Sequence, residues 1–161
     1  MLMNSENLYN KAKELEEADE LLEANQLYKR AFELDPEKNA LLAKIAFNYM
    51  IAGKSEEYIE YALKYLNEVP DSEKMMDSED TLWSLYHHLG VAFGKLGRSE
   101  KALKYFKEAI AIKNEPQSIM YAGKACMALG HEKEAISFWK TAAKMGNGKA
   151  ILALNTRGIE I

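Results

Sequence analysis

The chain has 161 residues, of which 48% are hydrophobic and 29% are charged, so it can bury one continuous core. Its N-terminal stretch lacks the apolar segment of a secretory signal, and no run approaches the ~20 apolar residues of a membrane helix. With the single cysteine Cys126, this predicts a cytoplasmic protein without membrane segments. The net charge of −4 is uneven, since residues 1–80 carry −10 and residues 81–161 carry +6.

The chain repeats one pattern along its length. Pro36 and Pro70 lie 34 residues apart, and each ends an apolar stretch of helical length. Gly97 and Gly130 lie 33 residues apart, and each follows a leucine and precedes a polar tetrapeptide and an alanine. A fixed period of this size indicates stacked supersecondary units rather than one irregular fold.

The clearest copy of the pattern is residues 97–112. Ala102 and Ala109 stand seven residues apart on one helical face, with Phe106 between them. Small residues at this spacing let two helices approach closely, and the aromatic ring fills the groove between them. We therefore expect Ala102 and Ala109 to be buried against the preceding helix, near Gly90.

These features resemble the tetratricopeptide repeat, a helix–turn–helix unit of 34 residues. Its signature is a small residue on the first helix, then alanine, an aromatic residue and alanine on the second, then proline. The resemblance implies an all-α, right-handed superhelical solenoid of about four repeats, with first helices on the concave side. In a single domain over residues 1–161, we place the repeats at residues 5–36, 39–70, 83–114 and 116–148.

Two regions depart from the signature. In the second repeat Tyr58 and Tyr65 flank Ala62, which inverts the usual order. We expect a wider helix crossing there, or a rotated second helix that lets Ala62 make the close contact and turns both hydroxyl groups toward water. Residues 71–80 are an acidic insertion, which we interpret as a flap over residues 71–77. A long helix over residues 78–96 would follow, capped by Asp77 or Ser78.

The C-terminal stretch, residues 149–161, follows Gly146-Asn147-Gly148 and contains one more short apolar segment. The stretch of residues 142–154, with its paired alanines and following glycine, also resembles the Sel1-type variant of the repeat. We expect a helix that caps the last repeat, followed by a tail that is mobile or borrowed by a neighbouring molecule.

No motif for catalysis, metal binding or a cofactor stands out. His87 and His88 are adjacent, so on a helix they point about 100° apart and cannot hold one metal ion together. Cys126 has no neighbouring histidine and is predicted to be a buried small residue. We therefore expect no enzyme activity, no metal and no cofactor.

A nucleic-acid partner is also not expected. Lys101, Lys104 and Lys107 form a row on a second helix, which the resemblance places on the outer, convex face. The chain contains only three arginines, the residue best suited to phosphate recognition.

The remaining candidate is the concave groove, whose methionine and aromatic residues suit an adaptable binding surface. The resemblance implies a scaffold that binds a peptide or helix of a partner protein. A carboxylate clamp is not expected, because Ala43, Phe47 and His88 stand where that pattern has lysine or asparagine. Register places these residues in the groove: Tyr9, Asn10, Lys13, Lys44, Phe47, Met50, His87, His88, Val91, Met120, Tyr121 and Lys124.

Two alternatives stay open. Small acidic members of this family act as secretion-type chaperones that hold an export substrate in the groove. The uneven charge instead favours head-to-tail assembly of identical copies, with the acidic front of one chain against the basic back of another. The partner would then be the chain itself.

Overall fold

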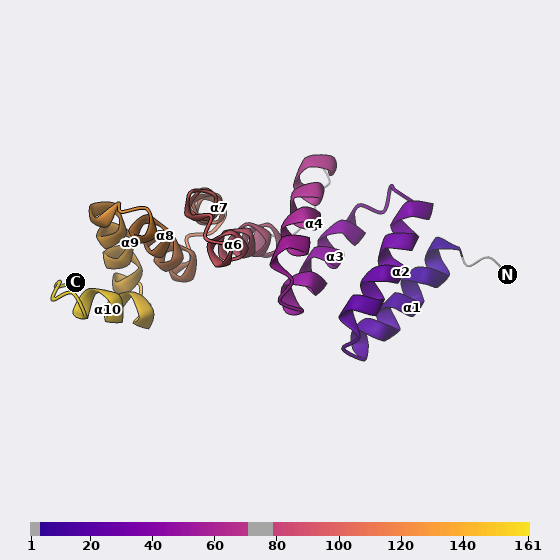
Figure 1. Ribbon diagram of the computed structural model, residues 1–161, viewed down its shortest axis with the longest axis horizontal. Coiled ribbons are helices and arrows are strands. Elements are labelled where there is room, and N and C mark those ends of the chain that lie inside the picture. Colours follow the sequence, from indigo (N-terminus) through magenta and orange to yellow (C-terminus); the bar gives the residue numbers. More distant parts are fainter. Residues whose placement is uncertain (1–3, 71–78) are drawn as a thin grey trace. The chain divides into compact units, whose positions relative to one another are not determined.

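The computed structural model describes residues 4–70 and 79–161, and all regular secondary structure in these ranges is α-helical. The predicted all-α class is confirmed (Figure 1). In chain order the described helices are α1 (Ser5–Glu17), α2 (Leu21–Leu34), α3 (Ala40–Ile51), α4 (Ser55–Glu68), α6 (Glu79–Lys95), α7 (Ser99–Ile112), α8 (Pro116–Ala128), α9 (Glu132–Lys144) and α10 (Gly148–Asn155).

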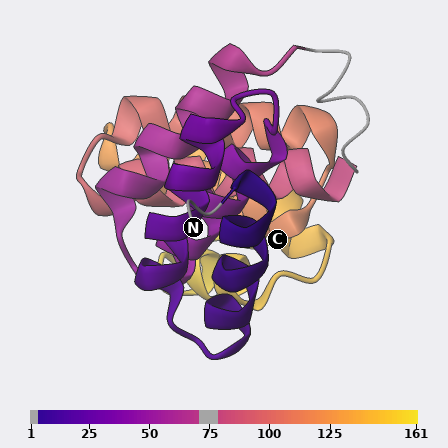
Figure 2. The same ribbon diagram turned by 90° about the vertical axis from the view of Figure 1, so that its right-hand side faces the viewer.

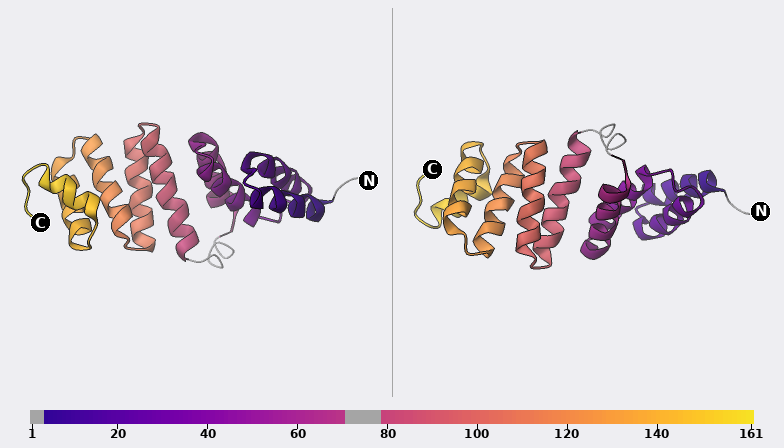
Figure 3. Two further views of the ribbon diagram at one scale, coloured as in Figure 1. Left: turned by 90° about the horizontal axis from the view of Figure 1, so that it is seen from below. Right: turned by 90° about the horizontal axis from the view of Figure 1, so that it is seen from above.

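The chain forms two compact units, Met1–Lys74 and Met75–Ile161, which we call unit 1 and unit 2. In unit 1, α1 pairs with α2 and α3 with α4, and α2 also packs on α3 (Figure 2). In unit 2, α6 pairs with α7 and α8 with α9, α7 packs on α8, and α10 packs on α9 (Figure 3). Residues 4–70 and 79–161 thus contain four helix pairs and a C-terminal helix, as predicted.

The predicted flap over residues 71–77 and the cap at Asp77 or Ser78 lie outside the described residues. The helix predicted over residues 78–96 is α6, which runs from Glu79 to Lys95. In the described part of the chain, no helix is both long and apolar enough to cross a membrane.

One turn geometry joins the two helices of every pair. The residue two positions after the first helix has a left-handed backbone, with φ of 72° at Gly53, 71° at Gly97 and 76° at Gly130. Asp19 occupies the same place between α1 and α2 with φ of 64°. In each case the backbone N–H of the residue after the left-handed one donates a hydrogen bond to the carbonyl oxygen five residues before it, as from Arg98 to Phe93. This hydrogen bond is common at the C-terminal ends of helices.

Glycine on the first helix allows the close crossings of unit 2. A methyl group on Gly90 would lie 2.6 Å from the Phe106 ring, and one on Gly123 would lie 2.6 Å from the Trp139 ring. Ala102 and Ala109 are buried, as predicted. The residue beside Ala102 is Gly94, however, because the Phe106 ring covers Gly90.

The α3–α4 pair is filled in another way. Tyr58 and Tyr65 are 1% and 2% exposed, and Ala62 between them is fully buried. The expectation that both hydroxyl groups turn toward water is therefore wrong. The two rings lie one turn to either side of Ala62, in the space that a central aromatic ring fills elsewhere. Burial raises the pKa of Tyr58 above its usual range.

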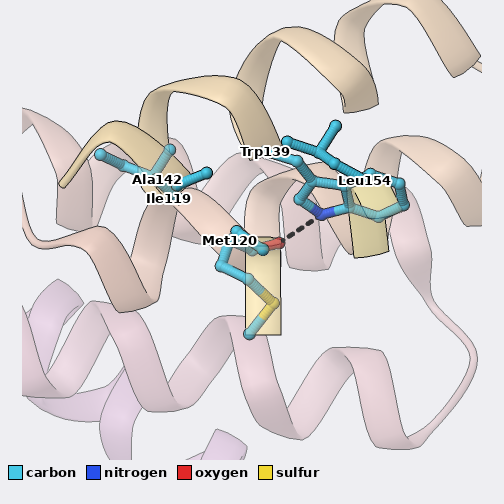
Figure 4. Close-up of a cluster of buried hydrophobic side chains, with 7 residues drawn as sticks. Ile119, Met120, Trp139, Ala142 and Leu154 are labelled. Atoms are coloured by element: carbon cyan, nitrogen blue, oxygen red, sulfur yellow. Dashed lines mark hydrogen bonds between the residues drawn. The ribbon is translucent and has the colours of Figure 1, made fainter. Parts of the chain in front are cut away.

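The C-terminal helix completes the core of unit 2. Asn147 caps α10 by accepting a hydrogen bond from the Ala150 N–H at 3.0 Å. Leu154 is fully buried in a cluster with Ile119, Trp139 and Ala142 (Figure 4). Ile159 packs against this cluster, so the tail expected to be free or borrowed is held by its own chain as far as that residue.

Candidate binding surfaces

In unit 1, two of the predicted groove residues line the same described cavity. Tyr9 and Asn10 on α1 line an open cavity of about 520 Å³ together with the loop and first turn that lead into α3. Lys38 in that loop donates to Ser5 Oγ at 3.3 Å and pairs with Asp35 at 3.3 Å. Its charge is therefore already partly satisfied within unit 1.

The other predicted residues of unit 1 lie elsewhere. The Lys44 ammonium group is 2.7 Å from a Glu16 carboxylate oxygen, and Lys13 pairs with Glu17 at 4.0 Å. The Tyr28 hydroxyl group donates to Glu16 at 3.0 Å, which helps to hold that carboxylate in place. Phe47 and Met50 are half-buried on α3, and neither lines a described cavity. Lys13 and Lys44 therefore already have acidic partners.

His87 does not face an open groove, contrary to expectation. It is 2% exposed, and its Nδ1 atom lies 2.9 Å from Ser118 Oγ, which also accepts a hydrogen bond from the Trp83 indole at 3.1 Å. The Trp83 ring stacks on the imidazole with centroids 5.2 Å apart. Burial, and next the neighbouring His88, lower the pKa of His87 to about 4, so the ring is neutral at pH 7.

Met120 is also interior rather than groove-lining. Its side chain is 6% exposed and belongs to the buried cluster of unit 2. Its carbonyl oxygen accepts the Trp139 indole N–H at 3.1 Å (Figure 4). The tryptophan that packs over Gly123 therefore ties α9 to this turn of α8, and Met120 is unavailable to a partner.

Three of the remaining predicted residues of unit 2 line one cavity of about 250 Å³ between α6, α7 and α8, which we call the unit 2 cavity. They are Val91, Tyr121 and Lys124, whereas His88 is half-buried on α6 and is not part of the cavity lining. The sequence analysis did not identify the small residues that leave room for this cavity, among them Gly94, Ala125 and Ala128. The cavity is lined by Gly90, Val91, Gly94, Lys95, Ser99, Ala102, Phe106, Tyr121, Lys124, Ala125 and Ala128.

Three lysines give this cavity a basic rim. Lys95 and Lys124 line it, and the Lys149 ammonium group lies 6.0 Å from the Tyr121 ring centroid. Within the described residues none of the three pairs with a carboxylate. The pKa of His88 is lowered, first by burial and also by the charge of Lys95. The cavity thus combines apolar walls with uncompensated positive charge.

No reactive centre emerges around these surfaces. Among the described residues, no three histidine, cysteine, aspartate or glutamate side chains come together as metal ligands would. Cys126 is buried, as predicted, and burial raises the pKa of its thiol to about 11. The thiol is therefore protonated at neutral pH and is a poor nucleophile.

Solved structures with the same fold have low sequence identity to this chain. MamA (AMB-1) superposes with a TM-score of 0.75 at 17% identity, covering 91% of this chain and 75% of its own. Another MamA crystal structure gives 0.74 at 20% identity, covering 92% and 85%. YrrB, described as a TPR protein with an unusual peptide-binding site, gives 0.71 at 22% identity, covering 89% and 71%.

No curated protein sequence matches the chain. The tetratricopeptide repeat profile, in contrast, matches residues 7–122. It does not reach the C-terminal stretch for which a Sel1 likeness was expected. The match spans more than two thirds of the chain and includes most of the helix pairs described above. The chain belongs to the tetratricopeptide repeat family.

Proposed function

We propose that this chain is a protein-interaction scaffold, and that the unit 2 cavity binds one apolar side chain of a partner segment whose neighbouring residues are acidic. The observation that carries the proposal is the basic rim around an apolar cavity. Lys95 and Lys124 line the cavity together with Val91, Phe106 and Tyr121, and Lys149 lies near the Tyr121 ring. None of the three lysines has an acidic partner among the described residues. An acidic partner would supply the charge that unit 2 leaves uncompensated.

The size of the cavity favours a side chain over a small molecule. Sites for cofactors and drug-sized ligands measure roughly 300–1,000 Å³, and the unit 2 cavity measures about 250 Å³. Its walls include Gly94, Ala125 and Ala128, which leave room without contributing bulk of their own. Family membership supports the same kind of partner, and the YrrB description names a peptide-binding site in a protein of this fold.

The proposal assigns fewer residues to partner contact than the predicted groove contains. Val91, Tyr121 and Lys124 are assigned to partner contact, together with Lys95, and His88 is not assigned to it because it does not line the cavity. His87 and Met120 are left out because both are buried. In unit 1, Tyr9 and Asn10 would offer a second contact area, while Lys13, Lys44, Phe47 and Met50 contribute less.

Short labelled peptides test this function. The probe has one leucine flanked by aspartate and glutamate, and its matched controls replace the leucine with alanine or the acids with lysine. We expect dilute full-length protein to bind only the acidic leucine peptide, measured by fluorescence anisotropy. The Tyr121→Ala variant should bind it about tenfold or more weakly, as expected for a central contact. Equal binding of all three peptides would contradict the proposal.

A further inference from the structure

Unit 1 exposes a leucine among acids. Leu22, in the first turn of α2, is 39% exposed, and Asp19, Glu20 and Glu23 beside it are exposed as well. We call these four residues the Leu22 corner. In the described part of the chain, none of the three carboxylates pairs with a lysine or arginine. The corner therefore presents an apolar side chain inside an uncompensated negative patch.

Asp19, a residue with a carboxylate side chain, occupies a turn position where the fold favours glycine. It has φ of 64°, and Gly53, Gly97 and Gly130 occupy the equivalent turns of the other three helix pairs. A residue with a side chain is less stable than glycine in this conformation. The turn thus retains a carboxylate at some cost in stability.

We propose that the unit 2 cavity of one copy binds the Leu22 corner of a second copy of this chain. The inference rests on the function proposed above for that cavity and names its occupant. Leu22 is the apolar side chain that enters the cavity beside the stacked Tyr121 and Phe106 rings. Asp19, Glu20 and Glu23 face the lysines of the rim.

The two surfaces are complementary in charge. Among the described residues, the three carboxylates beside Leu22 have no basic partner and the two lysines that line the cavity have no acidic partner, and Lys149 lies near the Tyr121 ring of the cavity wall. The pairing agrees with the uneven charge of the chain, which is −10 over residues 1–80 and +6 over residues 81–161. Because the contact joins two different surfaces and each copy carries both, it is heterologous, so copies add head to tail.

Sedimentation velocity of the full chain tests the inference. We expect wild-type protein to form species larger than a dimer as its concentration rises. Its apparent association constant should fall about tenfold or more between about 0.1 M and about 1 M salt, because the Debye length shrinks from ~10 Å to ~3 Å. A monomer at every concentration and both salt levels would overturn the inference.

Two variants then identify the surfaces. The cavity variant combines Lys95→Ser with Lys124→Ser and leaves the Leu22 corner intact. The corner variant combines Leu22→Ser with Glu20→Gln and leaves the unit 2 cavity intact. All four positions are exposed. Each variant alone should be monomeric, whereas their mixture should give a 1:1 complex that grows no further. That outcome requires one intact corner and one intact cavity on different copies.

Matched controls separate this contact from general charge or apolar effects. Lys101→Ser with Lys104→Ser removes two exposed lysines of α7 outside the cavity, and Leu34→Ser removes another exposed leucine of α2. Both controls should assemble as wild type does. Assembly that is lost in the controls, or kept in the cavity and corner variants, overturns the inference. A wild-type monomer that binds the acidic leucine peptide would refute only the second-copy partner and leave the proposed function standing.

Discussion

The α3–α4 and α6–α7 pairs have the same connecting turn but fill their interfaces in opposite ways. In α6–α7 one central ring, Phe106, packs over Gly90 between two alanines. In α3–α4 the centre is Ala62, and Tyr58 and Tyr65 fill the space on both sides. The difference shows that a helix crossing of this chain can be filled with small and large residues in either order, with the same left-handed turn.

The largest expected effect comes from emptying the α3–α4 crossing. Tyr58→Ala should lower the free energy of unfolding of unit 1 by about 3–5 kcal/mol, the usual cost of removing a buried aromatic ring. Tyr61→Ala on the same helix should cost less, because Tyr61 is only half-buried. Urea denaturation of the two variants makes the comparison. Equal losses would mean that Tyr58 does not fill the crossing.

Lowering the pH should reduce the stability of unit 2 through a histidine that unit 1 does not have. All three histidines lie in unit 2, and the pKa of His87 is lowered to about 4 by burial. Between about pH 6.5 and 4 the unfolded chain therefore binds a proton that the folded chain does not, so the stability of unit 2 falls as the pH falls. The full shift corresponds to up to about 3 kcal/mol.

Hydrogen exchange across this pH range, corrected for the intrinsic rate, reports the two units separately. His87→Gln should remove most of the pH dependence of unit 2, and His131→Gln, at an exposed position, should leave it unchanged. An identical pH profile for both units would contradict the buried neutral state of His87.

Two glycines one turn apart on α6 should respond oppositely to alanine. Gly90→Ala places a methyl group 2.6 Å from the Phe106 ring, so we expect a loss of about 1–3 kcal/mol from overpacking. Gly94→Ala places one at 3.9 Å from Ala102, in ordinary contact. It should stabilise the helix by up to about 1 kcal/mol. Thermal melts of both variants test the crossing, and similar melting temperatures would contradict the close approach at Gly90.

The smallest expected change in stability comes from the turn between α1 and α2. Asp19→Gly should stabilise unit 1 by about 1 kcal/mol, because glycine adopts positive φ without strain. Asp19→Asn should change stability little, since asparagine also tolerates this conformation. Chemical denaturation measures both variants. If Asp19→Gly is no more stable than Asp19→Asn, the turn carries no strain that glycine relieves.

Much of the fold could be predicted because it depends on local signals. Glycine after leucine at Gly97 and Gly130, and small residues seven apart at Ala102 and Ala109, mark the turns and crossings directly in the chain. These signals are periodic and need no knowledge of long-range contacts. The organisation of residues 1–161 as a single domain stays a prediction.

The candidate site was less predictable because it depends on contacts between helices. His87 has the sequence context of an exposed residue, yet Trp83 and Ser118, which is 31 residues away, enclose it. The unit 2 cavity exists because Gly94, Ala125 and Ala128 contribute little bulk, and absent side chains leave only a weak signal in a sequence rich in alanine. Register alone could assign Tyr121 and Lys124 to the inner face, but not the space beside them.

The most direct test of the account compares two substitutions at Gly94, which lines the unit 2 cavity without a side chain. Gly94→Ala adds one methyl group, whereas Gly94→Leu places a branched side chain where the partner's leucine would sit. The affinity of each folded variant for the acidic leucine peptide is measured by fluorescence anisotropy. The account predicts near wild-type binding by Gly94→Ala and a loss of about tenfold or more in Gly94→Leu. Equal binding by both variants would contradict it.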